Sequence, residues 1–431
     1  MYLAERSKLI DTENAFKIGP YIREVEESGH RVIKCNLGEP DFPVPEHIRE
    51  EVKRQIDLDN CHYVDPQGIL PLRKAVATYL SDTRGIKITP ERVVVYPGAK
   101  PPIGFSIQTY TNPGDEVVYP SPGFPIYESF IRYCEAAPKP VHLKEESGFT
   151  ITGQELAAQL SDKTRLIFLN FPSNPTGGVA SQDQLRDLAD AIVHHAPAGA
   201  RVFSDEIYEK ILFDGAQHHS IASLPGMAER TIIVSGASKS YSWTGGRIGW
   251  AAYPTEEEAQ IAKNLNINYF SCTAPYNQEG ARVGIESPKT QGWIDKMNQA
   301  FQERRDVVVG GLNAIPGVRC QKPLGAFYVF PNIAGVCETI GAIAAYRTLP
   351  EAVRQKSSPS TLFQMFLLFR YQVATMDRKS FGKFGTDGMH YLRLSIATGL
   401  ADLKEAVARI GRAAQDRDGF AKFVAEGKHL S

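Results

Sequence analysis

The stretch SGASKSYSWTGGRIGW, residues 235–250, holds two charged side chains among glycines, serines and aromatic residues. Lys239 follows an apolar run, so we expect it to lie where little water reaches it, and burial favours the neutral amine. A neutral amine attacks carbonyl carbons, which makes Lys239 a candidate nucleophile. Taken alone, it also fits an ordinary surface lysine, so other residues must decide between these two interpretations.

Two further side chains would complement a nucleophilic lysine. Asp205 ends the apolar run of VFSDEIYEKI, where a carboxylate can pair with a protonated ring nitrogen, although it also fits a helix N-cap. Phe124 lies in the proline-braced stretch PSPGFPIY and can stack on a flat ring, although it also fits the core.

The stretch YPGAKPPIGF and Arg247 together predict a phosphate site. Gly98, Ala99 and Lys100 lie between a predicted strand and a predicted helix, and backbone N–H groups at a helix start bind phosphate. Arg247 offers a guanidinium that binds phosphate oxygens in pairs. The chain contains neither GxxxxGK[ST] nor GxGxxG, which disfavours the nucleotide-binding phosphate loops.

These features match one cofactor, pyridoxal 5'-phosphate, which needs an amine for its aldehyde, an anion for its ring nitrogen, a stacking partner and a phosphate site. We expect no metal. The histidine pairs at 194–195 and 218–219 cannot share a helix or strand face, and no acidic cluster accompanies them in the sequence.

Composition limits the class of partner. The 431 residues carry 48 basic and 49 acidic side chains, so we expect neither nucleic acid nor a membrane surface as partner. The N-terminal residues are charged throughout, and Arg370 interrupts the longest apolar run, so neither a secretory signal nor a membrane span is predicted. The six cysteines show no ligand spacing. We expect a cytoplasmic protein that binds small molecules.

Short β-branched runs alternate with amphipathic stretches such as SQDQLRDLADAIVHHA. Six runs are predicted strands: ERVVVYPG, GDEVVYPSP, TRLIFLNFP, ARVFSDE, RTIIVSGAS and GRIGWAAYP. This alternation predicts an α/β fold, with a mostly parallel sheet covered by helices on both faces. Ligands of such sheets bind at the carboxyl ends of the strands.

The two ends of the chain differ from its middle, with helical patterns such as GWIDKMNQAFQERRDVVVGGLNAI and a final charged helix, ADLKEAVARIGRAAQDR. We predict that residues 1–50 form an N-terminal arm and part of a small domain. Residues 51–300 would form the large cofactor-binding domain, and residues 301–431 the rest of the small α+β domain.

The lysine stretch resembles a motif of the class I/II aminotransferases, fold-type I enzymes that use pyridoxal phosphate, in which S-K-x-x-x-x-T-G-x-R-x-G is typical. Further stretches that are similar to this family occur in its order along most of the chain: NLGEPDFPVPEHI, YVDPQGILPLRKAVATYL, VVVYPGAK, NPGDEVVYPSPGFPIY, NFPSNPTGGV, FSDEIYE, GAFYVFPNI and HYLRLSIA.

The resemblance implies roles for the matching residues. Lys239 would bond the cofactor aldehyde and shuttle a proton, and Asp205 would pair with the ring nitrogen. Arg393, Asn174 and the backbone at Gly38 would hold the substrate, where a guanidinium suits a planar carboxylate. The other cofactor-binding residues would be Ala99, Lys100, Phe124, Asn174, Tyr208, Ser238, Arg247 and, reaching across a homodimer with shared active sites, Tyr63.

The implied reaction is ping-pong transfer of an α-amino group from an amino acid to a 2-oxo acid. A lyase of the C–S β-lyase or aminocyclopropane-carboxylate-synthase type uses the same scaffold and stays an alternative. A transcription regulator with a degenerate aminotransferase domain is disfavoured, because no basic helix-turn-helix pattern precedes the first motif.

Three departures from the family pattern carry expectations of their own. Gly246 stands where tryptophan is frequent, which leaves the packing beside Arg247 open. Two prolines follow Lys100, so we expect the helix there to start later. The loosely matching segment 336–385 is expected to form part of the substrate entrance. No second arginine is identifiable as a clamp for a distal carboxylate, so the identity of the amino acid stays open.

Overall fold

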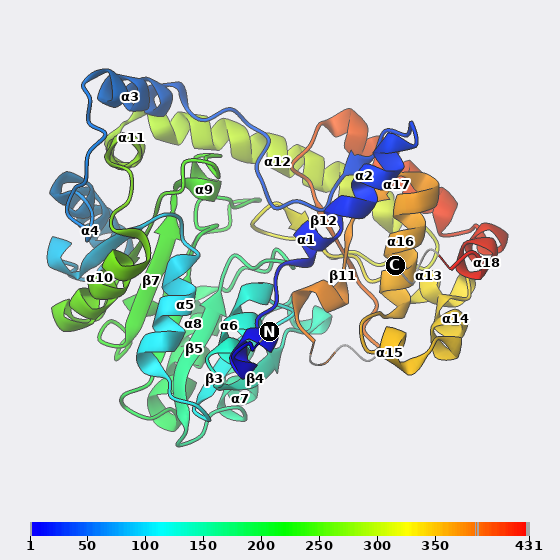
Figure 1. The fold of residues 1–431 in the computed structure, drawn as a ribbon, viewed down its shortest axis with the longest axis horizontal. Helices are drawn as coiled ribbons and strands as arrows, with labels where there is room; N and C mark the ends of the chain where they lie inside the picture. The colour runs from blue at the N-terminus through cyan, green and yellow to red at the C-terminus, as the bar shows by residue number, and fades with distance from the viewer. Residues whose placement is uncertain (1, 384, 386–387, 428–431) are drawn as a thin grey trace.

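The computed structural model describes residues 2–383, 385 and 388–427. Figure 1 shows a larger part built on a wide sheet and, beside it, a smaller part made of helices and short strands. The long helix α12 (Lys289–Asn313) runs from one part to the other. The predicted functional residues are distributed over both parts, so the site depends on how these parts meet.

A seven-stranded sheet forms the centre of the larger part, with the strand order β2-β8-β7-β6-β5-β3-β4. The five strands from β4 to β7 are parallel, whereas β8 is antiparallel to both of its neighbours. The six predicted strands and the mostly parallel sheet are therefore confirmed. The strands are β2 (Val93–Tyr96), β3 (Glu116–Ser121), β4 (Ala137–His142), β5 (Thr164–Asn170), β6 (Arg201–Asp205), β7 (Thr231–Gly236) and β8 (Gly249–Ala252).

The edge strand β4 was not predicted from the sequence. It contains Pro138 and Pro140, and it pairs only with β3. Proline has no N–H to donate, so it is tolerated at the edge of a sheet and rare in its middle. The two prolines explain why β4 was not predicted as a strand, and they are tolerated because β4 lies at the edge of the sheet.

Helices cover both faces of the sheet, as β2 illustrates, because successive strand residues point to opposite faces. Val94 and Tyr96 pack with residues of α5, α6 and α10, whereas Val93 and Val95 pack with residues of α4 and α11. The helices of the larger part are α3 (Glu46–Asp57), α4 (Leu70–Arg84), α5 (Pro101–Tyr110), α6 (Pro125–Tyr133), α7 (Gly153–Ala157), α8 (Gln182–His195), α9 (Ala237–Ser240), α10 (Glu256–Phe270) and α11 (Pro275–Glu286).

The smaller part contains a three-stranded antiparallel sheet, β11-β12-β9, and a parallel pair, β1 with β10. Ile33 pairs with Val373, so the first residues of the chain lie beside its last hundred. This pairing supports the proposed small domain made from residues 1–50 and 301–431. The elements are β1 (Ile33–Lys34), β9 (Tyr328–Val329), β10 (Val373–Ala374), β11 (Met376–Asp377), β12 (Leu392–Ser395), α13 (Ala334–Thr339), α14 (Ala342–Thr348), α15 (Glu351–Arg354), α16 (Pro359–Tyr371), η5 (Arg378–Phe381), α17 (Leu400–Ala413) and α18 (Arg417–Ala425).

Two expectations about helix ends were wrong. Helix α5 begins at Pro101 rather than later, because proline is tolerated in a first turn, where N–H groups have no helical partner. The predicted last helix corresponds to α17, but α18 follows it. Asp416 starts α18 by accepting a hydrogen bond from the Gly419 backbone N–H at 2.9 Å, as an N-cap residue does.

The longest apolar run forms α16, whose Leu362, Phe363 and Phe366 are buried in the core of the smaller part. Within the described chain, no helix combines the length and the apolar character needed to cross a bilayer.

The N-terminal arm consists of η1 (Glu5–Lys8), α1 (Asn14–Lys17) and α2 (Gly19–Glu27). It passes from the larger part, near α6, to the smaller part, where α2 lies beside α16 (Figure 1). Ile18 and Ile22 of the arm are buried in a cluster that also contains residues of β3 and β5. The arm is therefore packed against both parts of the molecule.

Candidate active site

The ends of β6 and β7 bring the two predicted catalytic residues into one region. Asp205 is the last residue of β6 and pairs with Val234 of β7. Strand β7 leads directly into the short helix α9, which contains Ser238 and Lys239. Because neighbouring parallel strands end at the same edge of a sheet, Asp205 and Lys239 both lie at the edge where such folds bind ligands.

Asp205 is buried and has two hydrogen-bond donors. The Tyr127 hydroxyl donates to Oδ2 at 2.5 Å, and the Ile207 backbone N–H donates to Oδ1 at 3.3 Å. Burial raises the pKa of Asp205 to about 6, while the hydrogen bond from Tyr127 acts in the opposite direction. The carboxylate is thus mainly ionised at neutral pH. Sequence analysis missed Tyr127, although it lies one helical turn after Phe124.

The amine of Lys239 is enclosed, and its Nζ donates to the backbone carbonyl of Gly38. It lies 5.8 Å from the centre of the Phe327 ring. Burial lowers the pKa of Lys239 to about 8, whereas the carboxylates of Glu13 and Glu39 act to raise it. A substantial fraction of the amine is therefore neutral slightly above pH 7, as its predicted role as a nucleophile requires.

The predicted phosphate site is built around Gly98 and Arg247. The guanidinium of Arg247 donates to the carbonyls of Thr244 at 2.7 Å and Pro97 at 3.3 Å. Gly98 has a φ of +93°, and a Cβ there would overlap this guanidinium. A positive charge therefore lies against the turn that leads into α5, where free backbone N–H groups also favour an anion.

Ala99 and Lys100 occupy that turn, with Lys100 in the N-cap position of α5. The ammonium of Lys100 binds Glu13 of the arm at 2.5 Å and lies 5.5 Å from the centre of the Phe124 ring. The backbone of Lys100 can thus belong to the phosphate site while its side chain lies over the residue predicted to stack on the cofactor.

Arg393 is buried in β12, between the rings of Tyr328 and Phe381, whose centres lie 4.5 and 4.9 Å from its Cζ. Its Nη2 donates to the carbonyl of Asn36, and its Nη1 donates to Oδ1 of Asn174 at 3.2 Å. Its buried Nε has no hydrogen-bond partner within the described part of the chain. A buried donor in this state favours a ligand acceptor, such as a carboxylate.

Tyr208 lies next to this arginine, since its hydroxyl is hydrogen-bonded to that of Tyr328 at 2.8 Å. A Cβ at Gly38 would overlap the Tyr328 hydroxyl, so a glycine is needed for this close approach. The structure thus brings Gly38, Asn174, Tyr208 and Arg393 together, as predicted. Tyr328, which no sequence argument identified, connects them.

Tyr63 is not brought into this pocket. It lies between α3 and α4, and its side chain is 87% exposed. Its predicted role in the active site of a second subunit stays a prediction.

One group of possible metal ligands lies behind the site: Glu206, Glu209 and His218. Arg84 donates to both carboxylates, and His218 lies 3.0 Å from Glu206. Since Arg84 already supplies the cation between the two acids, we interpret this group as a buried ion network at the turn after β6.

The packing of Trp243 requires a glycine at position 246. The indole of Trp243 covers Gly246 so closely that a Cβ at this position would overlap it. In this chain a tryptophan side chain thus occupies the space directly over Gly246, and a larger residue at position 246 would collide with it.

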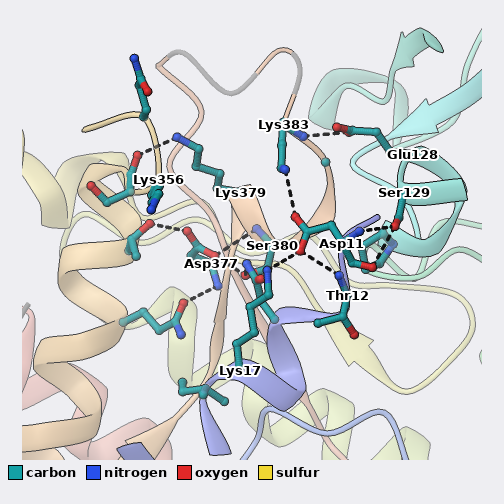
Figure 2. A pocket seen from close by; sticks show the side chains of 18 of the residues that line it. Asp11, Thr12, Lys17, Glu128, Ser129, Lys356, Asp377, Lys379, Ser380 and Lys383 are labelled. Carbon is teal, nitrogen blue, oxygen red and sulfur yellow. Dashed lines mark hydrogen bonds and ion pairs between the residues drawn. The ribbon is translucent and has the colours of Figure 1, made fainter. Parts of the chain in front are cut away.

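A cavity of about 870 Å³ lies outside the site, between the N-terminal arm, α6 and residues 352–383. Figure 2 shows Lys356, Lys379 and Lys383 around it, with Asp11 of the arm bonded to Ser129 and Lys383. Part of the loosely matched segment thus borders the arm that carries Glu13. That the segment 336–385 forms part of the substrate entrance stays a proposal. Phe384 of this segment lies outside the described residues.

Comparisons with known proteins agree with this geometry. The family "Aminotransferase class I and II" matches residues 30–410. The aspartate aminotransferase of Rhizobium meliloti strain 1021 is 34% identical over 411 residues, which are 95% of each chain. A crystal structure of the Rhizobium meliloti aspartate aminotransferase has a TM-score of 0.86 at 32% identity, covering 97% of this chain and 99% of that one. The aromatic aminotransferase of Pyrococcus horikoshii has a TM-score of 0.80 at 32% identity, covering 92% and 100%.

The amine of Lys239 should titrate with a midpoint near pH 8 in cofactor-free protein, because burial favours its neutral form. Reductive methylation with ¹³C-formaldehyde followed by NMR would report this titration, and the Lys239→Arg variant identifies the resonance by its absence. A midpoint near 10.5, the value of a free lysine, would contradict the buried environment.

Gly246→Ala should lower the free energy of unfolding by about 1–3 kcal/mol, because the added methyl group overlaps the Trp243 indole. Gly245→Ala is the matched control, since a Cβ there meets no atom within 4 Å. Urea denaturation of both variants gives the comparison. Equal stability of the two would show that Trp243 does not fix this packing.

Proposed function

Because the chain belongs to the class I and II aminotransferases, we propose that it transfers the amino group of aspartate, or of an amino acid with a similar second carboxylate, with pyridoxal 5'-phosphate as its cofactor. The family and the relatives identify transamination and do not support the lyase alternative. The observation that supports the choice of substrate is the ion pair between Lys100 and Glu13, because the charge of Glu13 also acts on Arg393 and Lys239.

Glu13 relates Lys100 to Arg393. It binds Lys100 at 2.5 Å. Burial lowers the pKa of Arg393, and the negative charge of Glu13 is among the groups that act against this lowering. Arg393 suits the α-carboxylate that all amino acids share. Lys100 supplies a positive charge for a second carboxylate. The relatives described above are named for different substrates, one an aspartate and one an aromatic aminotransferase, so their names do not choose between these substrates.

The residues present fit the proposed cofactor. The Gly98 turn and Arg247 offer an anion site that a Cβ would fill, Phe124 offers a flat ring, and buried Asp205 offers a carboxylate for a ring nitrogen. Asn174 and Tyr208 would bond the phenolic oxygen. Ser238 and Ala99 would complete the phosphate contacts.

When bound, the cofactor supplies a ring that accepts the electron pair released when the Cα–H bond of the substrate breaks. The chain contributes the remaining steps. Arg393 holds the α-carboxylate, which fixes the position of Cα. The neutral Nζ of Lys239 would take the proton from Cα. It would later give a proton to the carbon of the cofactor's former aldehyde group, which is bonded to the transferred nitrogen. Asp205, mainly ionised at neutral pH, would hold a proton on the ring nitrogen of the bound cofactor.

Burial also protects this chemistry from water. Arg393 is 4% exposed, and Asp205 is 7% exposed. Electrostatic interactions between such groups and a bound substrate are stronger than in water, because the surroundings screen them weakly. The burial that shifts the pKa of Lys239 thus also strengthens the hold on the substrate.

The proposed substrate is tested by half-reactions in the holoenzyme. Aspartate alone should convert the cofactor to its amine form, and 2-oxoglutarate should restore it, which absorbance spectroscopy follows. Lys100→Met should raise the KM for aspartate about tenfold, since one charge-assisted contact is lost. The same change should affect phenylalanine much less.

Lys17→Met is the control, because Lys17 is a lysine of the arm that pairs with Asp11 and not with Glu13. Reaction with aromatic amino acids and none with aspartate would contradict the substrate proposal while leaving transamination intact. Lys239→Ala should abolish both half-reactions; turnover without Lys239 would contradict the catalytic assignment.

We also propose a cytoplasmic homodimer with shared active sites. Exposed apolar side chains gather on two neighbouring regions, the segment 56–70 and helix α10. Asn266 of α10 donates to the Pro66 carbonyl at 2.8 Å, which joins the two regions into one surface. Tyr63 projects from it, and a second copy would bury it. All six cysteines are free thiols, in keeping with a reducing compartment.

Phe270→Glu should dissociate the proposed dimer, because it puts a charge on this surface. Val193→Glu is a matched control: Val193 is 42% exposed and Phe270 41%, but Val193 lies on α8. Sedimentation equilibrium measures the masses. A dimer that persists in the first variant, or dissociates equally in both, would exclude this surface as the interface.

A further inference from the structure

The Glu13–Lys100 ion pair has no role in the transamination steps above. Glu13 lies in the N-terminal arm, just before α1, and Lys100 lies at the start of α5. Their side chains are 19% and 44% exposed, so the pair lies at the boundary between the pocket and solvent. The arm therefore places a carboxylate on the cation that, in the proposed function, binds the second carboxylate of the substrate.

Three contacts hold this part of the arm independently of Lys100. The Asn14 side chain donates to the Ser380 hydroxyl at 3.0 Å. The Asp11 backbone N–H donates to the Ser129 hydroxyl at 2.8 Å, and that hydroxyl donates to the Asp11 carbonyl at 2.8 Å. Loss of the Glu13 contact alone would thus leave the arm attached to both parts of the molecule.

A substrate with a second carboxylate must compete with Glu13. The distal carboxylate of aspartate and the side chain of glutamate carry the same charged group. Two carboxylates on one ammonium repel each other, because like charges at short range are unfavourable. Full contact between Lys100 and the substrate therefore requires that Glu13 leave or weaken its bond.

We propose that Glu13 is an internal competitor for the distal carboxylate of the substrate and thereby determines specificity. It binds Lys100 in the free enzyme, and a dicarboxylic substrate replaces it. This inference rests on the proposed function, in which Lys100 binds that carboxylate.

The Glu13–Lys100 ion pair also affects the binding of amino acids without a second carboxylate. With Glu13 on Lys100, the cation is neutralised, so an apolar side chain does not leave an unpaired charge beside it. Glu13 thus weakens binding of dicarboxylic substrates and improves binding of apolar ones. Its removal should shift the preference in the opposite direction for each class.

The experiment measures binding of two inert carboxylates to the holoenzyme by calorimetry. Succinate has a second carboxylate, and 3-phenylpropionate has a ring instead. Glu13→Gln should tighten succinate binding about three- to fivefold, the range expected for release of a partly exposed ion pair. It should also weaken binding of 3-phenylpropionate.

Asp11→Asn is the matched control. Asp11 is the other arm carboxylate in this region, and it binds Lys17 at 2.5 Å and Lys383 at 2.9 Å, with no contact to Lys100 (Figure 2). This variant should leave the ratio of the two affinities unchanged. An equal gain in succinate binding by both variants would show that loosening of the arm, and not competition, is the cause, and would overturn the inference.

The Lys100→Met background separates the two proposals. Glu13→Gln should have no effect on succinate binding there, because the contested cation is gone. If Lys100→Met weakens succinate binding but Glu13→Gln alone does not strengthen it, the competitor role is wrong and the proposed function stands. If Lys100→Met leaves succinate and aspartate binding unchanged, the substrate proposal is wrong and the competitor role fails with it.

Discussion

The register of the parallel strands β5 and β6 is the constraint on which the active site depends. Asn170 at the end of β5 pairs with Asp205 at the end of β6. The Asn170 side chain donates to the Asp205 carbonyl at 3.0 Å and accepts a hydrogen bond from the Asn174 backbone N–H at 2.9 Å. One buried amide thus ties the loop that carries Asn174 to the strand that carries Asp205. A shift in register would separate the substrate contacts from the carboxylate.

Burial shifts the pKa values of both catalytic groups, Lys239 and Asp205. It lowers the pKa of Lys239 to about 8 and raises that of Asp205 to about 6, because it penalises the charged form of each. The lysine thereby gains a neutral fraction near physiological pH. The hydrogen bond from Tyr127 limits the rise at Asp205, so the acid keeps its charge while the amine can lose its own.

Local sequence patterns predicted those features that local chemistry determines. β-branched runs identified the buried parallel strands, and residue types at strand ends made Lys239 and Asp205 candidates. Arg393 was identified only through the resemblance to the family, because its place inside β12 was not predicted. Strand β4 escaped because its prolines lack the pattern of a central strand. Glu13 escaped because its partner Lys100 is 87 residues away and only the folded arm brings them together. Tyr328 escaped for a related reason: its importance lies in contacts with Tyr208 and Arg393, which no spacing in the sequence reveals.

The bond between Asn14 and Ser380 joins residues 366 positions apart, and β1 pairs with β10 across a similar distance. During synthesis, the sheet of the larger part can form once its last strand has left the ribosome. The arm, however, cannot reach its final partners before β10 and Ser380 have been synthesised. The arm is thus made before these partners and settles after them, so the surroundings of the lysine are completed only after the sheet has formed.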